Sequence, residues 1–168
     1  MEKKNVAVVM GGYSDEYKVS LKSGQLIYDS LDRELYNVYK VVILKDEWYF
    51  LDENEVKHPI NKGDFSVLLA DGTSLKFDVC FNIIHGKPGE NGELQAYWDT
   101  IGQTYTGCDF YQSALTFNKK DTLAVLAKYG VPSAKSLYFK KGEDIDADSV
   151  IAKLGLPLFV KPNQSGSS

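Results

Sequence analysis

Val6-Ala7-Val8-Val9-Met10 is a continuous apolar run, and Gly11-Gly12 follows it directly. Three of its five residues are β-branched, which favours an extended strand. Because the run has no polar alternation, it is typical of a strand buried on both faces, as in a parallel sheet. The run therefore predicts the first central strand of an α/β fold, with a glycine turn at its carboxyl end.

Helical and extended patterns alternate downstream of this strand. Residues 16–31 carry apolar side chains at three-to-four spacing, with Ser14 as the expected N-cap. Residues 38–44 and 77–84 have the pattern of further strands, and residues 93–101 that of a helix. This alternation predicts an α/β sheet with parallel strands.

An insertion occupies residues 45–76, between the second and third of these strands. It contains two segments with the pattern of small strands, at residues 47–51 and 66–69. His58 precedes Pro59 in its polar part, so we expect this histidine at the surface. No role for the insertion follows from its sequence.

The pattern changes after a short strand expected at residues 104–106. Asn118 has the position of an N-cap for a helix that Gly130 ends. This change predicts two domains, comprising residues 1–114 and 115–168.

The second of these domains contains a predicted helix at residues 146–154 and predicted strands at 136–139 and 158–160. It is only roughly fifty residues long, which is close to the lower limit for independent folding. We therefore expect a domain that is cut short rather than a complete one.

Composition limits the class of protein. Apolar residues make up 43% of the 168 residues and charged residues 25%, as in soluble globular proteins. The net charge of −4 argues against a nucleic-acid surface. No apolar run approaches the ~18 residues of a membrane helix, and the amino terminus lacks a signal-peptide pattern. A cytoplasmic protein without nucleic-acid or membrane partners is the expectation.

The two cysteines, Cys80 and Cys108, lie far apart and lack the spacing of metal ligands. We expect both to be buried thiols, with neither a disulfide nor a zinc site.

The first candidate site is the loop from Gly11 to Glu16, between the first strand and the first helix. Ligands of open α/β sheets bind at such carboxyl ends of strands, and glycines allow close backbone approach. Glu16 has two open interpretations: its carboxylate binds a ligand's ammonium group, or it only complements the helix dipole.

The second candidate site is the loop from His85 to Gly92, which follows a central strand. Three glycines, a proline and a histidine within eight residues predict a tightly shaped loop. His85 is either a polarising or acid–base group or a structural hydrogen-bonding residue.

The third candidate site combines lysines with a Gly/Ser segment. Lys161 precedes Asn163–Ser168, which has the composition of either a phosphate-binding loop or a polar tail. Lys119 and Lys120 lie in the first turn of a predicted helix, where positive charge opposes the dipole. A bound phosphate would offset that unfavourable charge.

Together these segments resemble the D-alanine–D-alanine ligases of the ATP-grasp superfamily. The resemblance covers most of the chain apart from the insertion, and it rests on the order and spacing of several motifs. These motifs are Val8–Ser20, His85–Gly92, Tyr105–Cys108, Ser113–Lys119, Val160–Pro162 and Gly166–Ser168.

The resemblance implies a Rossmann-like N-terminal domain with a parallel sheet, followed by the truncated start of an ATP-grasp α+β domain. It also implies a reaction in which ATP phosphorylates the carboxylate of one D-alanine, and the amine of a second D-alanine attacks the acyl phosphate. The product is the dipeptide used in peptidoglycan. ATP and D-alanine are the implied ligands, and dimers are common in the resembled family.

The resemblance also implies roles for residues at the first-substrate site. Glu16 corresponds to the carboxylate that holds the ammonium of the first D-alanine, and His85 to the histidine beside that substrate. Ser167 corresponds to the serine that helps to orient the glutamate.

At the nucleotide, Lys119 and Lys161 correspond to lysines that contact ATP phosphates, and Ser168 lies in the loop near those phosphates. The residues that bind Mg²⁺ in the family are expected beyond Ser168, so no metal ligand is assigned within this chain. A polypeptide of these 168 residues alone is expected to bind ATP poorly and to make no dipeptide.

Two alternatives stay open. A D-alanine–D-lactate ligase would share these motifs, because the feature that separates the two activities is expected outside this chain. A non-catalytic α/β binding module would instead have a closed, fully covered second domain. The ligase interpretation predicts exposed strand edges or poor order after about residue 115.

Overall fold

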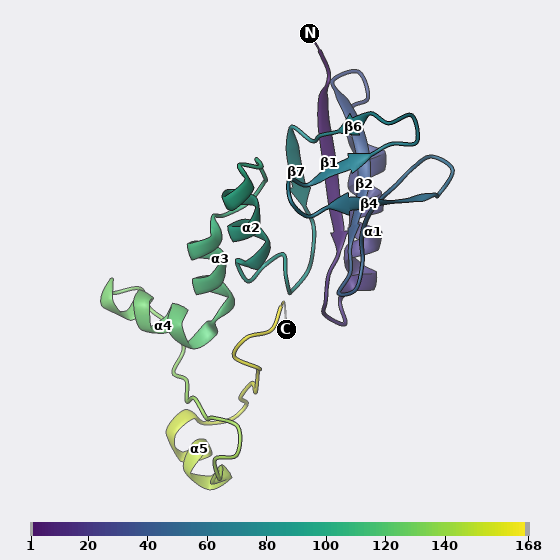
Figure 1. Cartoon of the computed structure of the whole chain (residues 1–168). Coiled ribbons are helices and arrows are strands. Elements are labelled where there is room, and N and C mark those ends of the chain that lie inside the picture. Colours follow the sequence, from purple (N-terminus) through teal and green to yellow (C-terminus); the bar gives the residue numbers. More distant parts are fainter. Residues whose placement is uncertain (1, 167–168) are drawn as a thin grey trace.

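A computed structural model describes residues 2–166 of the chain (Figure 1). The strands are β1 (Lys4–Gly11), β2 (Tyr36–Ile43), β3 (Trp48–Leu51), β4 (Lys57–Asn61), β5 (Ser66–Leu68), β6 (Ser74–Leu75) and β7 (Val79–Asn82). The helices are α1 (Tyr17–Ser30), α2 (Glu93–Ile101), α3 (Phe110–Phe117), α4 (Lys119–Lys128) and α5 (Ala147–Leu154).

The strands form one mixed sheet in the order β6-β5-β4-β3-β2-β1-β7. β1 pairs in parallel with both β2 and β7, which confirms the predicted parallel centre. From β2 outward the pairings are antiparallel, so the insertion extends the sheet as a meander. Its strands β4 and β6 were not predicted from the sequence. β4 contains Pro59 and has only one buried apolar side chain, Ile60, so its pattern carries little strand signal.

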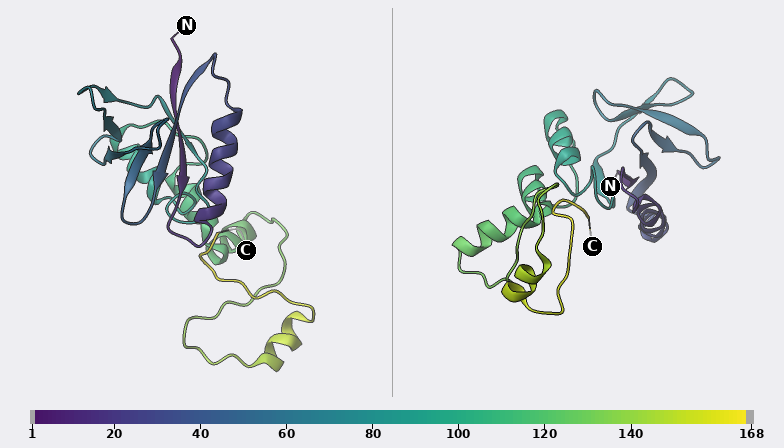
Figure 2. Two further views of the ribbon diagram at one scale, coloured as in Figure 1. Left: turned by 90° about the vertical axis from the view of Figure 1, so that its right-hand side faces the viewer. Right: turned by 90° about the horizontal axis from the view of Figure 1, so that it is seen from below.

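The central sheet is covered on both faces (Figures 1 and 2). Val8 and Met10 of β1 lie in a core cluster that includes side chains of α1. Ala7 and Val9, which alternate with them, pack in a second cluster with α2 and the insertion. The uniformly apolar run at residues 6–10 therefore has a physical cause, because both sets of alternating side chains are buried.

The insertion contributes to this second core instead of extending into solvent. Phe65 and Val67 are almost fully buried and belong to the same cluster as Trp98 of α2. The rings of Phe65 and Trp98 meet edge to face at 5.8 Å. His58 is half-buried, stacks on Phe50 and lies 3.0 Å from an Asp52 oxygen, so its predicted surface position is wrong. The sequence analysis placed His58 wrongly because it did not recognise β4 as a strand.

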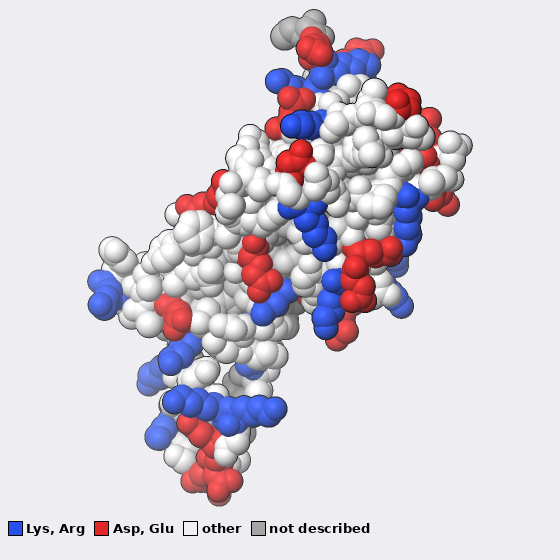
Figure 3. Space-filling view, in the orientation of Figure 1, with Lys and Arg blue, Asp and Glu red and all other residues white. Residues whose placement is uncertain are grey.

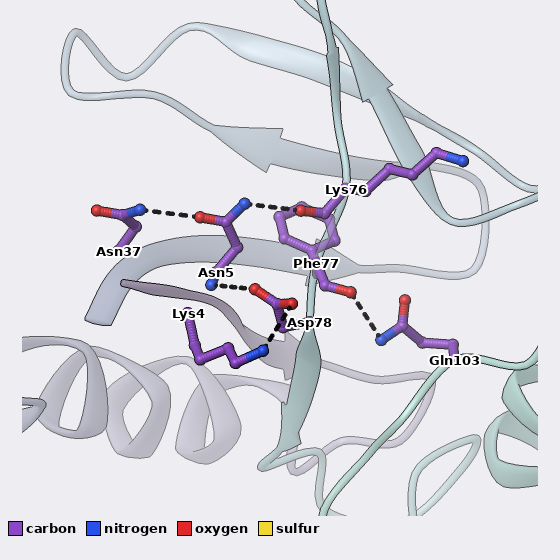
Figure 4. Close-up of polar contacts among 7 residues, drawn as sticks. All are labelled: Lys4, Asn5, Asn37, Lys76, Phe77, Asp78 and Gln103. Atoms are coloured by element: carbon purple, nitrogen blue, oxygen red, sulfur yellow. Dashed lines mark hydrogen bonds and ion pairs between the residues drawn. The ribbon is translucent and has the colours of Figure 1, made fainter. Parts of the chain in front are cut away.

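Hydrogen bonds that involve side chains connect the amino ends of the central strands (Figure 4). The Asn5 backbone N–H donates to Asp78 at 2.7 Å, and the Asn5 side-chain amide donates to the Lys76 carbonyl at 3.0 Å. Asn37 of β2 donates to the Asn5 side-chain oxygen at 3.0 Å. The segments that lead into β1, β2 and β7 are thus joined at this edge, and the candidate site lies at the opposite, carboxyl edge.

The chain beyond α2 consists of helices and irregular segments that extend away from the sheet (Figures 1 and 2). Helix α4 begins after Asn118, whose side chain accepts a hydrogen bond from a backbone N–H of the first turn, as predicted. α3 was not predicted, and it spans the proposed domain boundary at residues 114 and 115, which remains a prediction. The expected strand at residues 104–106 is reduced to a single bridge between Tyr105 and Cys80.

The two strands predicted after α4 are absent. Residues 136–139 and 158–160 have no strand pairing, and Phe159 and Val160 are 89% and 90% exposed. An apolar segment becomes a strand only when another backbone pairs with it, and neither segment is hydrogen-bonded into a ladder within residues 2–166, although the two segments border one cavity. The exposure agrees with the incomplete domain that the ligase interpretation predicts and disagrees with a closed module.

Surface features are consistent with an ordinary globular surface. On the face shown in Figure 3, acidic and basic side chains are interspersed. Among residues 2–166, none of the helices has the length and apolarity needed to cross a membrane. Cys80 is buried as predicted, whereas Cys108 is exposed, because it lies in the loop before α3 and not in the sheet.

Candidate functional site

A cleft of about 490 Å³ lies at the carboxyl end of β7. It is bounded by the end of β7, the loop at residues 85–92, helices α2 and α3, the first residue of α4, and the returning segment at residues 163–166. The residues that line it include Asn82, His85, Glu90, Gln95, Thr106, Ser113, Lys119 and Gly166. Segments far apart in the sequence thus meet at one edge of the sheet.

The loop after β1 approaches the loop after β7 closely because it contains glycines. Gly12 has a φ of +111°, and a Cβ on it would lie 2.8 Å from the Ile84 side chain. Its N–H donates to the Ile43 carbonyl at 2.8 Å. Any larger residue at position 12 would separate the two loops.

Ser20 holds the ends of β1 and β7 together from helix α1. Its buried hydroxyl accepts from the Gly11 N–H at 2.9 Å and donates to the Ile83 carbonyl at 2.8 Å. The sequence analysis did not single out Ser20. A serine on the apolar side of a predicted amphipathic helix is the signal that could have found it.

His85 lines the cleft and lies three residues after the end of β7. Its backbone carbonyl accepts from the Ser14 hydroxyl at 2.9 Å, so Ser14 bridges two loops instead of capping α1 as predicted. Glu16 occupies the N-cap position, without a side-chain capping bond. The His85 Nε2 atom is buried and has no hydrogen-bond partner. His85 thus lines the cleft and carries a buried polar atom that no described residue satisfies.

The loop that carries His85 is braced by side chains that the sequence analysis missed. Glu90 accepts from the Gly86 N–H at 2.9 Å. The Gly89 carbonyl accepts from Asn82 at 2.8 Å and from the buried Gln95 at 2.5 Å. These hydrogen bonds depend on the folded conformation of this loop, and the sequence analysis did not predict them.

Glu16 lies beside the returning segment near the end of the chain. A Cβ placed on Gly166 would meet the Glu16 carboxylate and would lie 3.2 Å from a Glu90 oxygen. Gly166 does not have a positive φ, so space and not backbone conformation explains a glycine there. Two carboxylates therefore face one point in the fold, which suits a positively charged ligand group.

Lys119 connects α4 to the same returning segment. Its Nζ donates to the Ser165 carbonyl at 3.0 Å, and it lines the cleft with His85. The backbone N–H groups of Lys119 and Lys120 donate to the backbone and side-chain oxygens of Asn163, at 3.1 and 2.8 Å. Two backbone N–H groups at the start of α4 are therefore satisfied by Asn163.

Lys161 lies apart from the main cleft. It is exposed, with its Nζ 5.9 Å from the ring centre of Phe159. Together with Lys119 it borders a second cavity of about 250 Å³. The other two predicted site residues, Ser167 and Ser168, lie outside the described residues. Within residues 2–166, no group of three or more His, Cys, Asp or Glu side chains is arranged to hold a metal ion.

The two thiols of the chain differ in accessibility. Cys80 is fully buried in β7, and burial raises the pKa of its thiol far above the ordinary value. Cys108 is exposed and lines the cleft, so the groups around the cleft are a carboxylate, an imidazole, amides, hydroxyls, a thiol and the Lys119 ammonium.

A parallel-centred sheet with glycine turns, whose polar cleft lies where the strands end, defines an α/β ligand-binding protein. The chain belongs to the family described as D-ala D-ala ligase N-terminus, whose model matches residues 5–108. This confirms the family resemblance found in the motifs.

Comparison with individual relatives supports the same family assignment. The D-alanine–D-alanine ligase of Flavobacterium psychrophilum is 59% identical over 164 residues, which are 98% of this chain and 49% of the relative. The ligase structure from Coxiella burnetii matches with a TM-score of 0.86 and 25% identity, over 98% of this chain and 54% of that one. The chain spans about half the length of the curated relatives it matches.

A third relative carries the nucleotide. The D-alanine–D-alanine ligase of Bacillus anthracis complexed with ATP matches with a TM-score of 0.69 and 28% identity. The match covers 96% of this chain and 48% of that one. The family therefore includes an ATP-bound member.

Proposed function

We propose that this chain forms the N-terminal half of a D-alanine–D-alanine ligase, which acts in the cytoplasm to supply the dipeptide for peptidoglycan. In the reaction, the carboxylate of one D-alanine attacks the γ-phosphorus of ATP, giving an acyl phosphate and ADP. The amine of a second D-alanine then attacks the acyl carbon, a proton is lost from nitrogen, and inorganic phosphate leaves. Phosphorylation is needed because a carboxylate oxygen is otherwise a poor leaving group.

The observation that carries the proposal is the convergence of Glu16 and Lys119 on one short segment. The Glu16 carboxylate meets Gly166, and the Lys119 ammonium binds the neighbouring Ser165 carbonyl. A carboxylate suited to an amine and a lysine suited to a phosphate are thereby brought to one edge of the sheet, as joining an amino acid to ATP requires.

For the first D-alanine, Glu16 is proposed to bind the ammonium group with a charge-assisted hydrogen bond. His85 is proposed to lie beside the same substrate, because it lines the cleft and its Nε2 atom has no hydrogen-bond partner among residues 2–166. Ser167 is proposed to orient Glu16, because it follows Gly166, the residue in contact with that carboxylate.

For ATP, the proposed phosphate contacts are Lys119, Lys161 and Ser168. The first two border the same cavity, which supports a shared role despite the exposure of Lys161. Mg²⁺ would shield phosphate charge in such a reaction. Residues 2–166 supply no cluster of metal ligands, so we propose that its ligands lie beyond residue 168.

The test uses the full-length protein that contains this chain. With ATP and D-alanine it should release ADP and form D-alanyl-D-alanine in equal amounts. Replacing the second substrate with D-lactate separates this activity from that of a D-alanine–D-lactate ligase, which would form the ester. A folded full-length protein that forms neither product would contradict the proposal. Sedimentation of the same sample tests the further expectation of a homodimer.

A further inference from the structure

The insertion at residues 45–76 touches the candidate site through one side-chain hydrogen bond. Trp48, the first residue of β3, donates from its indole Nε1 to the Tyr13 hydroxyl oxygen at 3.1 Å. Tyr13 lies between Gly12 and Ser14 in the loop that leads to Glu16. The insertion and the first-substrate loop are thus in direct contact.

Three groups contact the Trp48 ring, and these contacts fix the direction of its indole N–H. It packs edge to face against Tyr97 at 5.5 Å and against Phe65 at 6.3 Å. The Lys62 ammonium lies 4.9 Å from the ring centre. The direction of the indole N–H is therefore set by the core that the insertion forms with α2.

Tyr13 connects the insertion to both loops of the candidate site. Its backbone N–H donates to the Lys87 carbonyl at 2.7 Å, in the loop that carries His85. The adjacent Ser14 hydroxyl donates to the His85 carbonyl at 2.9 Å. Burial raises the pKa of the Tyr13 phenol, which therefore stays neutral at physiological pH.

We propose that Tyr13 and Trp48 form a latch through which the insertion positions Glu16 and His85 for the first D-alanine. This role rests on the function proposed above. Tyr13 is a positioning residue, because its contacts are with the loops and it acts through the side chains that they carry. The loop needs such a brace, since Tyr13 is 38% exposed and its neighbour Asp15 is also exposed.

The first test is kinetic and uses Tyr13→Phe in the full-length protein. This change removes the hydroxyl and keeps the ring. We expect the KM for the first D-alanine to rise about two- to tenfold, the range of one net hydrogen bond, with the KM for ATP unchanged. Trp48→Phe should have the same effect, and the double variant should be no worse than either single variant, because both remove one interaction.

Tyr97→Phe is the matched control. It also removes a tyrosine hydroxyl that binds the insertion, through the Lys62 carbonyl, but it leaves the loop at residues 11–16 untouched. We expect a similar loss of stability and no change in the KM for D-alanine. Equal rises in KM for Tyr97→Phe and Tyr13→Phe would overturn the latch, as would unchanged kinetics in Tyr13→Phe.

Amide hydrogen exchange tests the latch without using activity. Tyr13→Phe should speed exchange at residues 12–16, whereas Tyr97→Phe should not. If the wild-type protein makes no dipeptide, the proposed function fails and exchange alone decides on the latch. Unchanged exchange at these amides in Tyr13→Phe would refute it.

Discussion

Replacing Glu16 by glutamine should weaken the binding of the first D-alanine. The carboxylate lies at the start of α1 and meets Gly166, at a point that a Glu90 oxygen also faces. Glutamine keeps the size of the side chain and removes its charge. A hydrogen bond to a charged group contributes roughly 1.5–3 kcal/mol, which corresponds to about a 10- to 150-fold change in affinity.

The assay measures initial rates of ADP release by the full-length protein while D-alanine is varied at saturating ATP. The expected result for Glu16→Gln is a KM for the first D-alanine raised within that range, with the KM for ATP unchanged. Asp15→Asn is the matched control, since it removes the same charge from an exposed side chain one residue away. That variant should behave as the wild type.

The alternative role for Glu16 predicts a different pattern. A carboxylate that only complements the helix dipole would contribute about 0.3–1 kcal/mol to the free energy of unfolding. A small loss of stability in Glu16→Gln with unchanged kinetics would therefore refute the ammonium-binding role.

Three further predictions concern the framework of the site. Ser20→Ala leaves two buried backbone groups without their partner, so the free energy of unfolding measured in urea should fall by about 1–3 kcal/mol; a negligible change would contradict the bridging role. A maleimide reagent should label Cys108 well before Cys80 in peptide maps, because Cys108 is exposed, whereas Cys80 is buried and its pKa is raised. The hydrogen bond with His58 lowers the pKa of Asp52, so its stabilising contribution is present above its ordinary pKa near 4 and is lost as pH falls through the lowered value. Asp52→Asn should therefore reduce the acid-dependent loss of stability, and identical acid unfolding curves would exclude this contribution.

Local sequence patterns predicted those elements whose cause is local. The apolar run at residues 6–10 became the central strand β1, and the helix at residues 93–101 was predicted with its observed bounds. Asn118 was recognised as an N-cap because its side chain bonds to the adjacent turn. In each case the deciding interaction lies within a few residues of the signal or in a simple burial pattern.

Elements that depend on distant partners were predicted less well. Residues 136–139 and 158–160 are apolar enough for strands, but pairing decides strand formation and neither segment is paired within the described residues. The hydrogen bond from the Lys120 N–H to Asn163 was not predicted, because the two residues lie more than forty positions apart. Ser20 was missed for the same reason, since its bond to the Ile83 carbonyl exists only once α1 packs against the end of β7.

The resemblance to the ligase family supplied the candidate residues, and the structure shows which of them lie near one another. It brings Glu16, His85 and Lys119 to one edge of the sheet, with Lys161 at an adjoining cavity. Ser167 and Ser168 lie outside the described residues, so their roles remain predictions.

The central claim is that this chain is a working N-terminal half of a ligase. It is tested most directly by joining residues 1–168 to the C-terminal half of the Flavobacterium psychrophilum relative, which is 59% identical over the shared region. With ATP and D-alanine, the joined protein should form D-alanyl-D-alanine and ADP in equal amounts, while residues 1–168 alone should form none. A joined protein that folds, as judged by circular dichroism and cooperative unfolding, yet makes no dipeptide would contradict the account.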